Sequence, residues 1–295
     1  MKPTWNILYR GSLSSCNYAC DYCPFAKTSN TREELQADAE EVSRFVDWVE
    51  QTSDRRIGVL FTPWGEALIR PAYREALTRL SRLPHVYRVA IQTNLSGPLA
   101  WVGEADREKL GLWSTFHPTQ VERGRFLARC RELDARGARY SVGVVGLREH
   151  FQDIEVLRRE LPPHVYLWIN ANKREPNYYS DADLRRLRAV DPYFDLNRQV
   201  YVSLGGPCRA GHTSFTVSGD GTVRRCHFIE APIGHLYRGD IAERLEPSPC
   251  SNTTCRCHIG YVHRPELELY ELFGDGVLDR IPARWPQAEA RWVAS

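Results

Sequence analysis

Nine cysteines are the residues of this sequence with the clearest capacity for chemistry. They form two groups and leave one residue apart: Cys16, Cys20 and Cys23; Cys130; and Cys208, Cys226, Cys250, Cys255 and Cys257. Thiolates bind soft metals and take part in redox reactions, and in a reducing compartment these uses prevail over structural disulfides. The sequence therefore predicts a metal-binding or redox protein.

The first group, Cys16-x3-Cys20-x2-Cys23, lies between a predicted strand and the first long predicted helix. On a flexible loop, three thiolates at this spacing can bind three irons of a [4Fe–4S] cluster and leave the fourth iron without a protein ligand. An open iron can bind a substrate or a cofactor. The alternative is a zinc site, which prefers four closed ligands and Cys-x2-Cys pairs.

The elements that must position these thiols alternate between strand and helix, which predicts a parallel sheet covered by helices. The predicted strands are Trp5–Tyr9, Ile57–Thr62, Tyr87–Gln92, Leu112–Phe116, Arg139–Val145 and Val165–Ile169. The predicted helices are Arg32–Thr52, Ala72–Arg82, Glu104–Leu110, Glu122–Arg136, Phe151–Glu160 and Ser180–Val190. Six such units are fewer than the eight of a closed barrel, so we expect an α/β fold with a partial (β/α)6 barrel.

The pattern changes after about residue 200. The segment Ser214–Cys226 predicts a β-hairpin that turns at Gly219-Asp220-Gly221, and Pro265–Phe273 predicts a short helix. Residues 201–295 hold five of the nine cysteines but little apolar periodicity, so we expect a small second domain that depends on a bound metal group. The predicted domains are 1–200 and 201–295.

The composition excludes several classes of protein. With 295 residues, 42% of them hydrophobic, the chain can bury a full core. The net charge of +2 with scattered basic residues gives no electrostatic case for nucleic acid. No apolar stretch approaches the roughly 20 residues of a membrane helix, and the start of the chain lacks the pattern of a signal peptide. We expect a cytoplasmic protein.

The motif Cys-x3-Cys-x2-Cys after the first strand of a βα repeat resembles the radical S-adenosylmethionine (AdoMet) superfamily, whose fold is a partial (β/α)6 barrel. The resemblance implies that Cys16, Cys20 and Cys23 hold a [4Fe–4S] cluster whose open iron chelates the methionine amine and carboxylate of AdoMet. It also implies that one electron from the cluster cleaves AdoMet to a 5′-deoxyadenosyl radical.

Two further segments match AdoMet contacts of this superfamily. Tyr22 matches the aromatic residue beside the adenine. The segment Thr62–Ala67 resembles the Gly-Gly-Glu-Pro segment, and it departs from that pattern at Trp64 and Ala67. The resemblance therefore implies contacts from Gly65 and Glu66 to the methionine ammonium.

The ends of later strands supply more candidates. The resemblance makes Asn94 and Ser114 candidates for the methionine carboxylate and ribose, with loop capping as the alternative role. Val144 and Gly146 belong to a segment that could lie against the adenine, with tight packing as the alternative. His117 is either a proton shuttle or a structural histidine.

The second group contains Cys208-x12-Gly221-x4-Cys226, which resembles the auxiliary-cluster domains called SPASM and, in truncated form, twitch. A full SPASM domain needs seven cysteines, so five imply one auxiliary [4Fe–4S] cluster of the twitch kind. A fully ligated cluster takes four thiolates and leaves one cysteine free. The expected ligands are Cys208, Cys226, Cys255 and Cys257, and the expected free thiol is Cys250.

Two alternatives to this assignment stay open. In the first alternative, Cys250 binds the cluster and either Cys255 or Cys257 is free. This alternative stays open because sequence does not determine which cysteines bind together. A zinc site with His227 or His258 is the second alternative. Cys130 lies in a predicted helix and is expected to be a small buried apolar residue.

The segment from Leu8 to Lys27, together with the five-cysteine tail, resembles the small twitch radical enzymes of aminocyclitol antibiotic biosynthesis. That resemblance implies an epimerase that inverts the 5‴ carbon of an aminoglycoside of the neomycin type. Cys250 would return hydrogen to the substrate radical, and an external reductant of the flavodoxin or ferredoxin type would supply electrons. Glu149, Glu175 and Asp220 are candidates to bind the polycationic substrate, with a surface role as the alternative.

Three other functions are alternatives. Without a donor thiol, the same substrate radical would lose an electron and give a ketone, so a dehydrogenase acting on an alcohol of an aminocyclitol or sugar is the second reading. A peptide-modifying enzyme is less favoured, because the sequence begins at its first strand and shows no leader-binding segment before it. A non-enzymatic zinc or redox scaffold is the third alternative.

Overall fold

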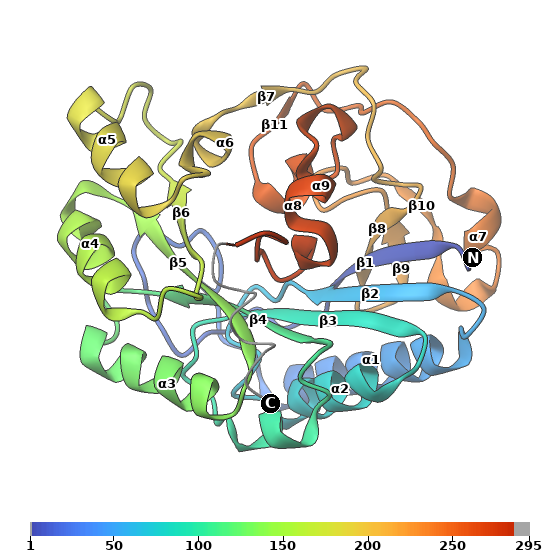
Figure 1. Ribbon diagram of the computed structural model, residues 1–295. Coiled ribbons are helices and arrows are strands. Elements are labelled where there is room, and N and C mark those ends of the chain that lie inside the picture. Colours follow the sequence, from blue (N-terminus) through green and yellow to red (C-terminus); the bar gives the residue numbers. More distant parts are fainter. Residues whose placement is uncertain (1, 286–295) are drawn as a thin grey trace.

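The computed structural model describes residues 2–285 as a mixed α/β protein built on one curved sheet (Figure 1). The strand order is β10-β9-β8-β1-β2-β3-β4-β5-β6, and β1 to β6 pair in parallel. These strands are β1 (Thr4–Arg10), β2 (Arg56–Phe61), β3 (Val86–Thr93), β4 (Leu110–Phe116), β5 (Arg139–Gly146), β6 (Leu167–Ala171), β8 (Ser214–Ser218), β9 (Thr222–Arg224) and β10 (Pro232–His235). A second, two-stranded sheet pairs β7 (Tyr201–Val202) with β11 (Thr254–Cys255).

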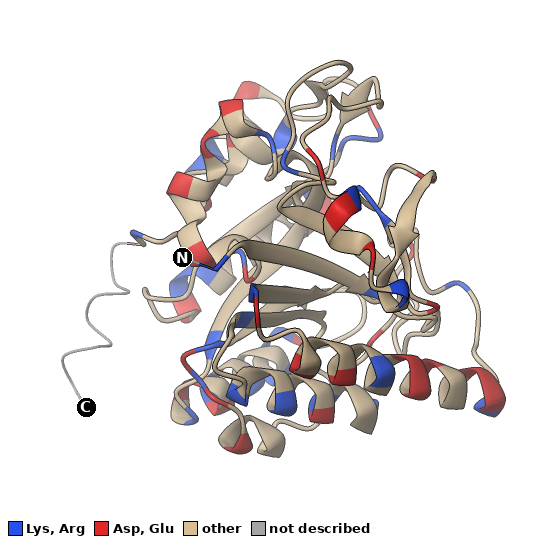
Figure 2. Cartoon of the chain, turned by 90° about the vertical axis from the view of Figure 1, so that its right-hand side faces the viewer, with Lys and Arg blue, Asp and Glu red and all other residues tan. Residues whose placement is uncertain are grey.

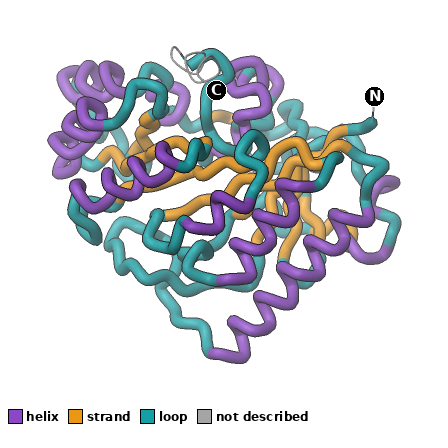
Figure 3. Tube along the Cα trace, turned by 60° about the horizontal axis from the view of Figure 1, so that its bottom comes forward, coloured by secondary structure: helices purple, strands orange, loops and turns teal. Residues whose placement is uncertain are grey.

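Helices cover the outer face of the sheet, as the tube view shows (Figure 3). The α-helices are α1 (Arg32–Gln51), α2 (Pro71–Arg82), α3 (Arg123–Ala135), α4 (Phe151–Glu160), α5 (Asp181–Val190), α6 (Phe194–Arg198), α7 (Ile241–Arg244), α8 (His258–Tyr261) and α9 (Leu269–Phe273). Short 3-10 helices are η1 (Ala100–Glu104), η2 (Arg148–His150), η3 (Leu236–Arg238), η4 (Pro265–Leu267) and η5 (Gly274–Val277). Basic and acidic residues are interspersed on these helices (Figure 2). Residues 2–285 contain no helix long and apolar enough to cross a membrane.

The predicted hairpin is confirmed and extends the main sheet. Strands β8 and β9 are antiparallel, and the turn between them ends at Gly221, whose φ of 93° lies in the left-handed region that favours glycine. Strand β8 pairs in parallel with β1, with Ser218 opposite Arg10. The sheet therefore continues beyond residue 200, and the domain division at that residue stays a prediction.

Two predicted helices differ from the structure. Residues 104–110 are not helical, because η1 ends at Glu104 and a turn follows in which the Asp106 carbonyl accepts from the Leu110 N–H at 2.9 Å. The predicted helix 265–273 is divided into η4 and α9 at Glu268, whose φ of 52° is left-handed. Periodicity alone detected neither the turn nor this break.

Two apolar cores lie on opposite faces of the sheet. One core packs the outer face against α1 to α5, and Cys130 belongs to it with 1% exposure, as expected. On the inner face, Leu8, Leu60, Trp113 and Trp168 pack against the segment that carries α8 and α9 (Figure 1). The C-terminal segment thus fills much of the curve of the sheet.

Candidate active site

The cysteine loop between β1 and α1 lies across the carboxyl edge of the parallel sheet. It is fastened to the loops after β3, β4 and β6 by hydrogen bonds from Asn17 Nδ2 to Ser96 Oγ (3.0 Å), from the Ala19 N–H to Gln120 Oε1 (2.9 Å) and from Arg174 Nη2 to Tyr22 O (2.8 Å). Ligands of open α/β folds bind at this edge. The loop therefore places its thiols where a cofactor would be expected.

The three thiols of this loop lie near one another. All are free, and Cys20 is buried while Cys16 and Cys23 are half-buried. Burial, with smaller contributions from the neighbouring Cys23 and Cys16 thiols, raises the pKa of Cys20 to about 11. Without a metal the Cys20 thiol stays protonated at neutral pH, whereas a bound iron would hold it as a thiolate.

Gly65 brings the end of β2 against the cysteine loop. A Cβ on Gly65 would stand 1.7 Å from the Ser15 carbonyl oxygen, so only glycine allows this approach. The sequence-predicted Gly65 is therefore in contact with the residue before Cys16.

Glu66, the next residue, is buried at 2% exposure. Its carboxylate accepts hydrogen bonds from the Leu68 N–H (3.1 Å), Thr93 Oγ1 (2.7 Å) and the Asn94 N–H (2.6 Å). Burial raises the pKa of Glu66 to about 7, and these three hydrogen bonds oppose the rise. Glu66 thus joins the ends of β2 and β3, and its contact with AdoMet stays a prediction.

Asn94 and Ser114 occupy different surroundings. Asn94 Nδ2 lies 3.2 Å from Asn17 Oδ1 and 3.9 Å from Cys16 Sγ, so this side chain reaches the cysteine loop. Ser114 lies two residues from both Leu112 and Phe116 of the outer core in β4, so its side chain shares their face and points towards the helices. Ser114 is fully buried, and its Oγ finds no hydrogen-bond partner within residues 2–285.

Of the remaining predicted AdoMet contacts, Tyr22 lies in the cysteine loop, whereas Val144 and Gly146 lie in β5. Tyr22 Oη lies 3.0 Å from His117 Nδ1, and the two rings stack at 5.9 Å. Burial lowers the pKa of His117 to about 4, so its ring is neutral at pH 7. The Val144 side chain belongs to the outer core, and a Cβ on Gly146 would meet Ile169 at 2.8 Å.

Strand alternation identifies inner-face residues that the sequence analysis did not single out. Arg10, Thr62, Gln92, Thr115 and Asn170 each follow an inner-core residue by two positions, which places them at the open end of the inner face. Arg10 Nε donates to the Thr62 carbonyl at 3.0 Å. The two-residue period of the strands was the signal that could have found them.

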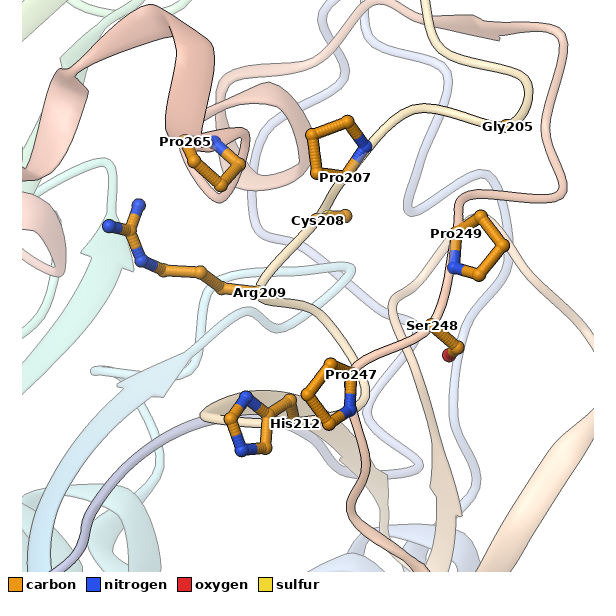
Figure 4. A pocket seen from close by; sticks show the side chains of 9 residues that line it. All are labelled: Gly205, Pro207, Cys208, Arg209, His212, Pro247, Ser248, Pro249 and Pro265. Carbon is orange, nitrogen blue, oxygen red and sulfur yellow. The ribbon is translucent and has the colours of Figure 1, made fainter.

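The five cysteines of the second group come from three separated segments. Cys257 is exposed, whereas the other four are half-buried. Cys208 lines a cavity of about 500 Å³ between residues 205–212 and 247–249, and Figure 4 shows these two segments facing each other. His227 Nε2 lies 2.8 Å from Thr62 Oγ1, and His258 Nε2 is buried without a hydrogen-bond partner among the described residues.

The free thiols of the first cysteine loop are the type of ligand that the implied iron–sulfur cluster takes. Within residues 2–285, no group of three or more His, Cys, Asp or Glu closes on a single metal ion. The thiolates of a [4Fe–4S] cluster bind separate irons, so they stand further apart than ligands of one ion. Beside the first cysteine group, Ser15 Oγ is buried and without a partner in the described part of the chain, which leaves a polar group for a bound molecule.

No protein-family model and no curated protein sequence matches this chain. Solved structures do match it. SuiB of Streptococcus suis aligns with a TM-score of 0.56 and 12% identity over 83% of this chain and 66% of SuiB. The protein anSMEcpe, solved with bound AdoMet and Kp18Cys peptide, aligns with a TM-score of 0.55 and 16% identity over 83% of this chain and 81% of that chain.

The likeness to these two structures, one of them solved with bound AdoMet, shows the fold. The chain spans just under two thirds of the length of SuiB and about four fifths of anSMEcpe. The expected α/β fold with a large parallel sheet is confirmed. The three-cysteine loop follows β1 and so lies at the carboxyl edge of the six parallel strands.

Proposed function

We propose that this chain is a radical AdoMet enzyme in which Cys16, Cys20 and Cys23 hold a [4Fe–4S] cluster and AdoMet binds beside them. The observation that carries the proposal is the Cys-x3-Cys-x2-Cys loop, fastened across the carboxyl edge of a fold shared with radical AdoMet enzymes. When bound, the two groups together supply a 5′-deoxyadenosyl radical that removes a hydrogen atom from a substrate.

The chain's own residues would shape the cofactor site and the mouth of the barrel. Gly65 lets the β2 loop support the cysteine loop, and Asn94 supports it from β3. The rings of Tyr22 and the neutral His117 stack on each other at the carboxyl edge of the sheet. The open end of the inner face, with Gln92, would bind and orient the substrate.

The reaction that we propose is epimerisation, with hydrogen returned by a cysteine thiol to the face opposite the one that lost it. The thiol gives up one hydrogen atom, and one electron from an external flavodoxin- or ferredoxin-type reductant plus one solvent proton restore it. Support comes from the five cysteines of the second group, since an auxiliary cluster uses four.

The proposed substrate is an aminoglycoside, by resemblance to neomycin C epimerase. Its ammonium groups would need carboxylates near the mouth. Glu149 follows β5, Glu175 follows β6, and Asp220 lies in the turn after β8, which runs parallel to β1. All three exposed residues thus belong to loops at the carboxyl edge.

A peptide is the second candidate substrate. SuiB has been solved bound to precursor peptide SuiA, and anSMEcpe has been solved with the Kp18Cys peptide; both share the fold of this chain. A peptide would occupy the same open end of the barrel, so one assay can compare the two substrate classes.

The first test is anaerobic reconstitution with iron and sulfide, followed by AdoMet and a one-electron reductant. We expect about eight irons per chain, about four in the C16A/C20A/C23A variant, and 5′-deoxyadenosine from the wild type only. Neomycin C in D2O should then give an epimer with deuterium at the inverted carbon. Zinc without iron, or no cleavage of AdoMet, would contradict the proposed class; a ketone product would favour a dehydrogenase.

A further inference from the structure

Hydrogen bonds hold Cys250 against the segment that leads to Cys208. The Gly205 N–H donates to the Cys250 carbonyl at 2.8 Å, and the Cys250 N–H donates to the Gly206 carbonyl at 2.9 Å. This reciprocal pair continues the pairing of β7 with β11, in which Tyr201 lies opposite Cys255. The backbone of Cys250 is therefore held against Gly206, which precedes Cys208 by two residues.

The guanidinium of Arg225 joins the segments of three cysteines. Its Nη2 donates to the Ala210 carbonyl at 3.0 Å, and its Nη1 donates to the Pro249 carbonyl at 2.5 Å. Arg225 precedes Cys226, Ala210 follows Cys208 by two residues, and Pro249 precedes Cys250. One side chain thus brings Cys208, Cys226 and Cys250 into one neighbourhood, and Figure 4 shows Cys208 and Pro249 on its facing segments.

Cys255 belongs to the same neighbourhood. A Cβ on Gly260 would stand 2.8 Å from Cys255 Sγ and 3.0 Å from the Phe228 ring, so the thiol and the ring both lie against Gly260. Phe228 follows Cys226 by two residues, and its carbonyl accepts from Asn252 Nδ2 at 2.8 Å.

Cys257 lies elsewhere, at the start of α8 and exposed. The residue before it, Arg256, exchanges hydrogen bonds with Lys173, which follows β6. Cys257 therefore stands beside the loop that follows the carboxyl end of β6.

We propose that Cys208, Cys226, Cys250 and Cys255 hold the auxiliary [4Fe–4S] cluster and that Cys257 is the free thiol at the mouth of the barrel. This exchanges the roles that the sequence alone favoured for Cys250 and Cys257. The inference rests on the proposed function, and it makes Cys257 the thiol that gives a hydrogen atom to the substrate radical. The electron and proton that restore it come from the external reductant and solvent.

The ligand set is tested in the C16A/C20A/C23A background, where only the auxiliary cluster can assemble. Adding C257A should leave about four irons per chain and the electron paramagnetic resonance signal of the reduced cluster. Adding C250A should reduce the iron content and abolish that signal. Loss of the cluster with C257A, or its retention with C250A, would overturn the assignment.

A second measurement uses the wild-type holoenzyme, so it does not depend on the folding of a variant. Anaerobic iodoacetamide followed by peptide mass spectrometry should label Cys257 and spare Cys250, with buried Cys130 as the internal control for an unliganded but inaccessible thiol. Labelling of Cys250 with protection of Cys257 would refute the inference. Wild-type protein that binds no iron would instead refute the proposed function, so the two failures are distinguishable.

Discussion

The tightest contact of the candidate site is the approach of Gly65 to the Ser15 carbonyl. A methyl group at Gly65 would stand 1.7 Å from that oxygen, and both partners are backbone, so the cysteine loop must move. We expect G65A to lower the free energy of unfolding by about 1–3 kcal/mol, the usual cost of overpacking. Iron content after reconstitution should also fall, because Cys16 follows Ser15 directly.

Gly124 in α3 provides the matched control for this substitution. A Cβ there would meet nothing within 4 Å, and alanine is favoured over glycine in a helix by up to about 1 kcal/mol. G124A should therefore keep its iron and unfold at the same or higher urea concentration than the wild type. Equal stability and iron content in G65A and wild type would show that the two loops do not approach so closely.

Of the predicted AdoMet contacts, some side chains lie beside the cysteine loop and others face the helices, and their contacts with AdoMet stay predictions. Gly65 and Asn94, which the family resemblance singled out, both lie beside the cysteine loop. Ser114 and Val144 also lie at strand ends, but their side chains share a face with outer-core residues. Which face a residue occupies depends on strand register against both cores, and a motif match does not contain that information.

At the scale of elements, Glu66 links the carboxyl ends of β2 and β3. Burial raises the pKa of this carboxyl to about 7 from 4.5. The folded state therefore binds more protons than the unfolded state between these values. The stability that this group contributes is complete below about pH 4.5 and is lost as the pH rises through about 7.

We expect the stability of the wild type, measured relative to E66Q, to decrease by on the order of 3 kcal/mol between pH 4.5 and 8. Urea unfolding of both proteins across this range provides the measurement, and the difference removes the titration of all other groups. A difference that stays constant, or that rises with pH, would mean that Glu66 is not buried as the structure shows.

The accuracy of the predicted elements depended on their length and on what stabilises them. Helices such as α1 and α5 have an apolar face and a complete capping box, from Thr31 and Ser180 respectively, so local sequence contains their signals. The four-residue α8 and five-residue α9 are too short to be stable alone. They exist because they pack on the inner face of the sheet, which no local pattern reveals.

At the scale of the whole molecule, the inner face of the barrel depends on the C-terminal segment. Leu8, Leu60, Trp113 and Trp168 are each less than 5% exposed, and their partners include Ile259, Phe273 and Leu278. In residues 1–200 alone these four side chains would face water. An exposed apolar patch of this kind destabilises a fold and promotes association.

We therefore expect the fragment 1–200 to lack a cooperative unfolding transition and to bind the dye ANS, while the full chain unfolds cooperatively under the same conditions. Circular dichroism in the near ultraviolet should show the loss of fixed packing around Trp113 and Trp168, whose rings meet edge to face at 5.7 Å. A soluble fragment with a cooperative transition would instead support an independent first domain. Whether the fragment folds alone matters for the proposed chemistry, because the C-terminal segment also carries Cys255 and Cys257. If the barrel needs this segment, the packing of the barrel also places these two thiols.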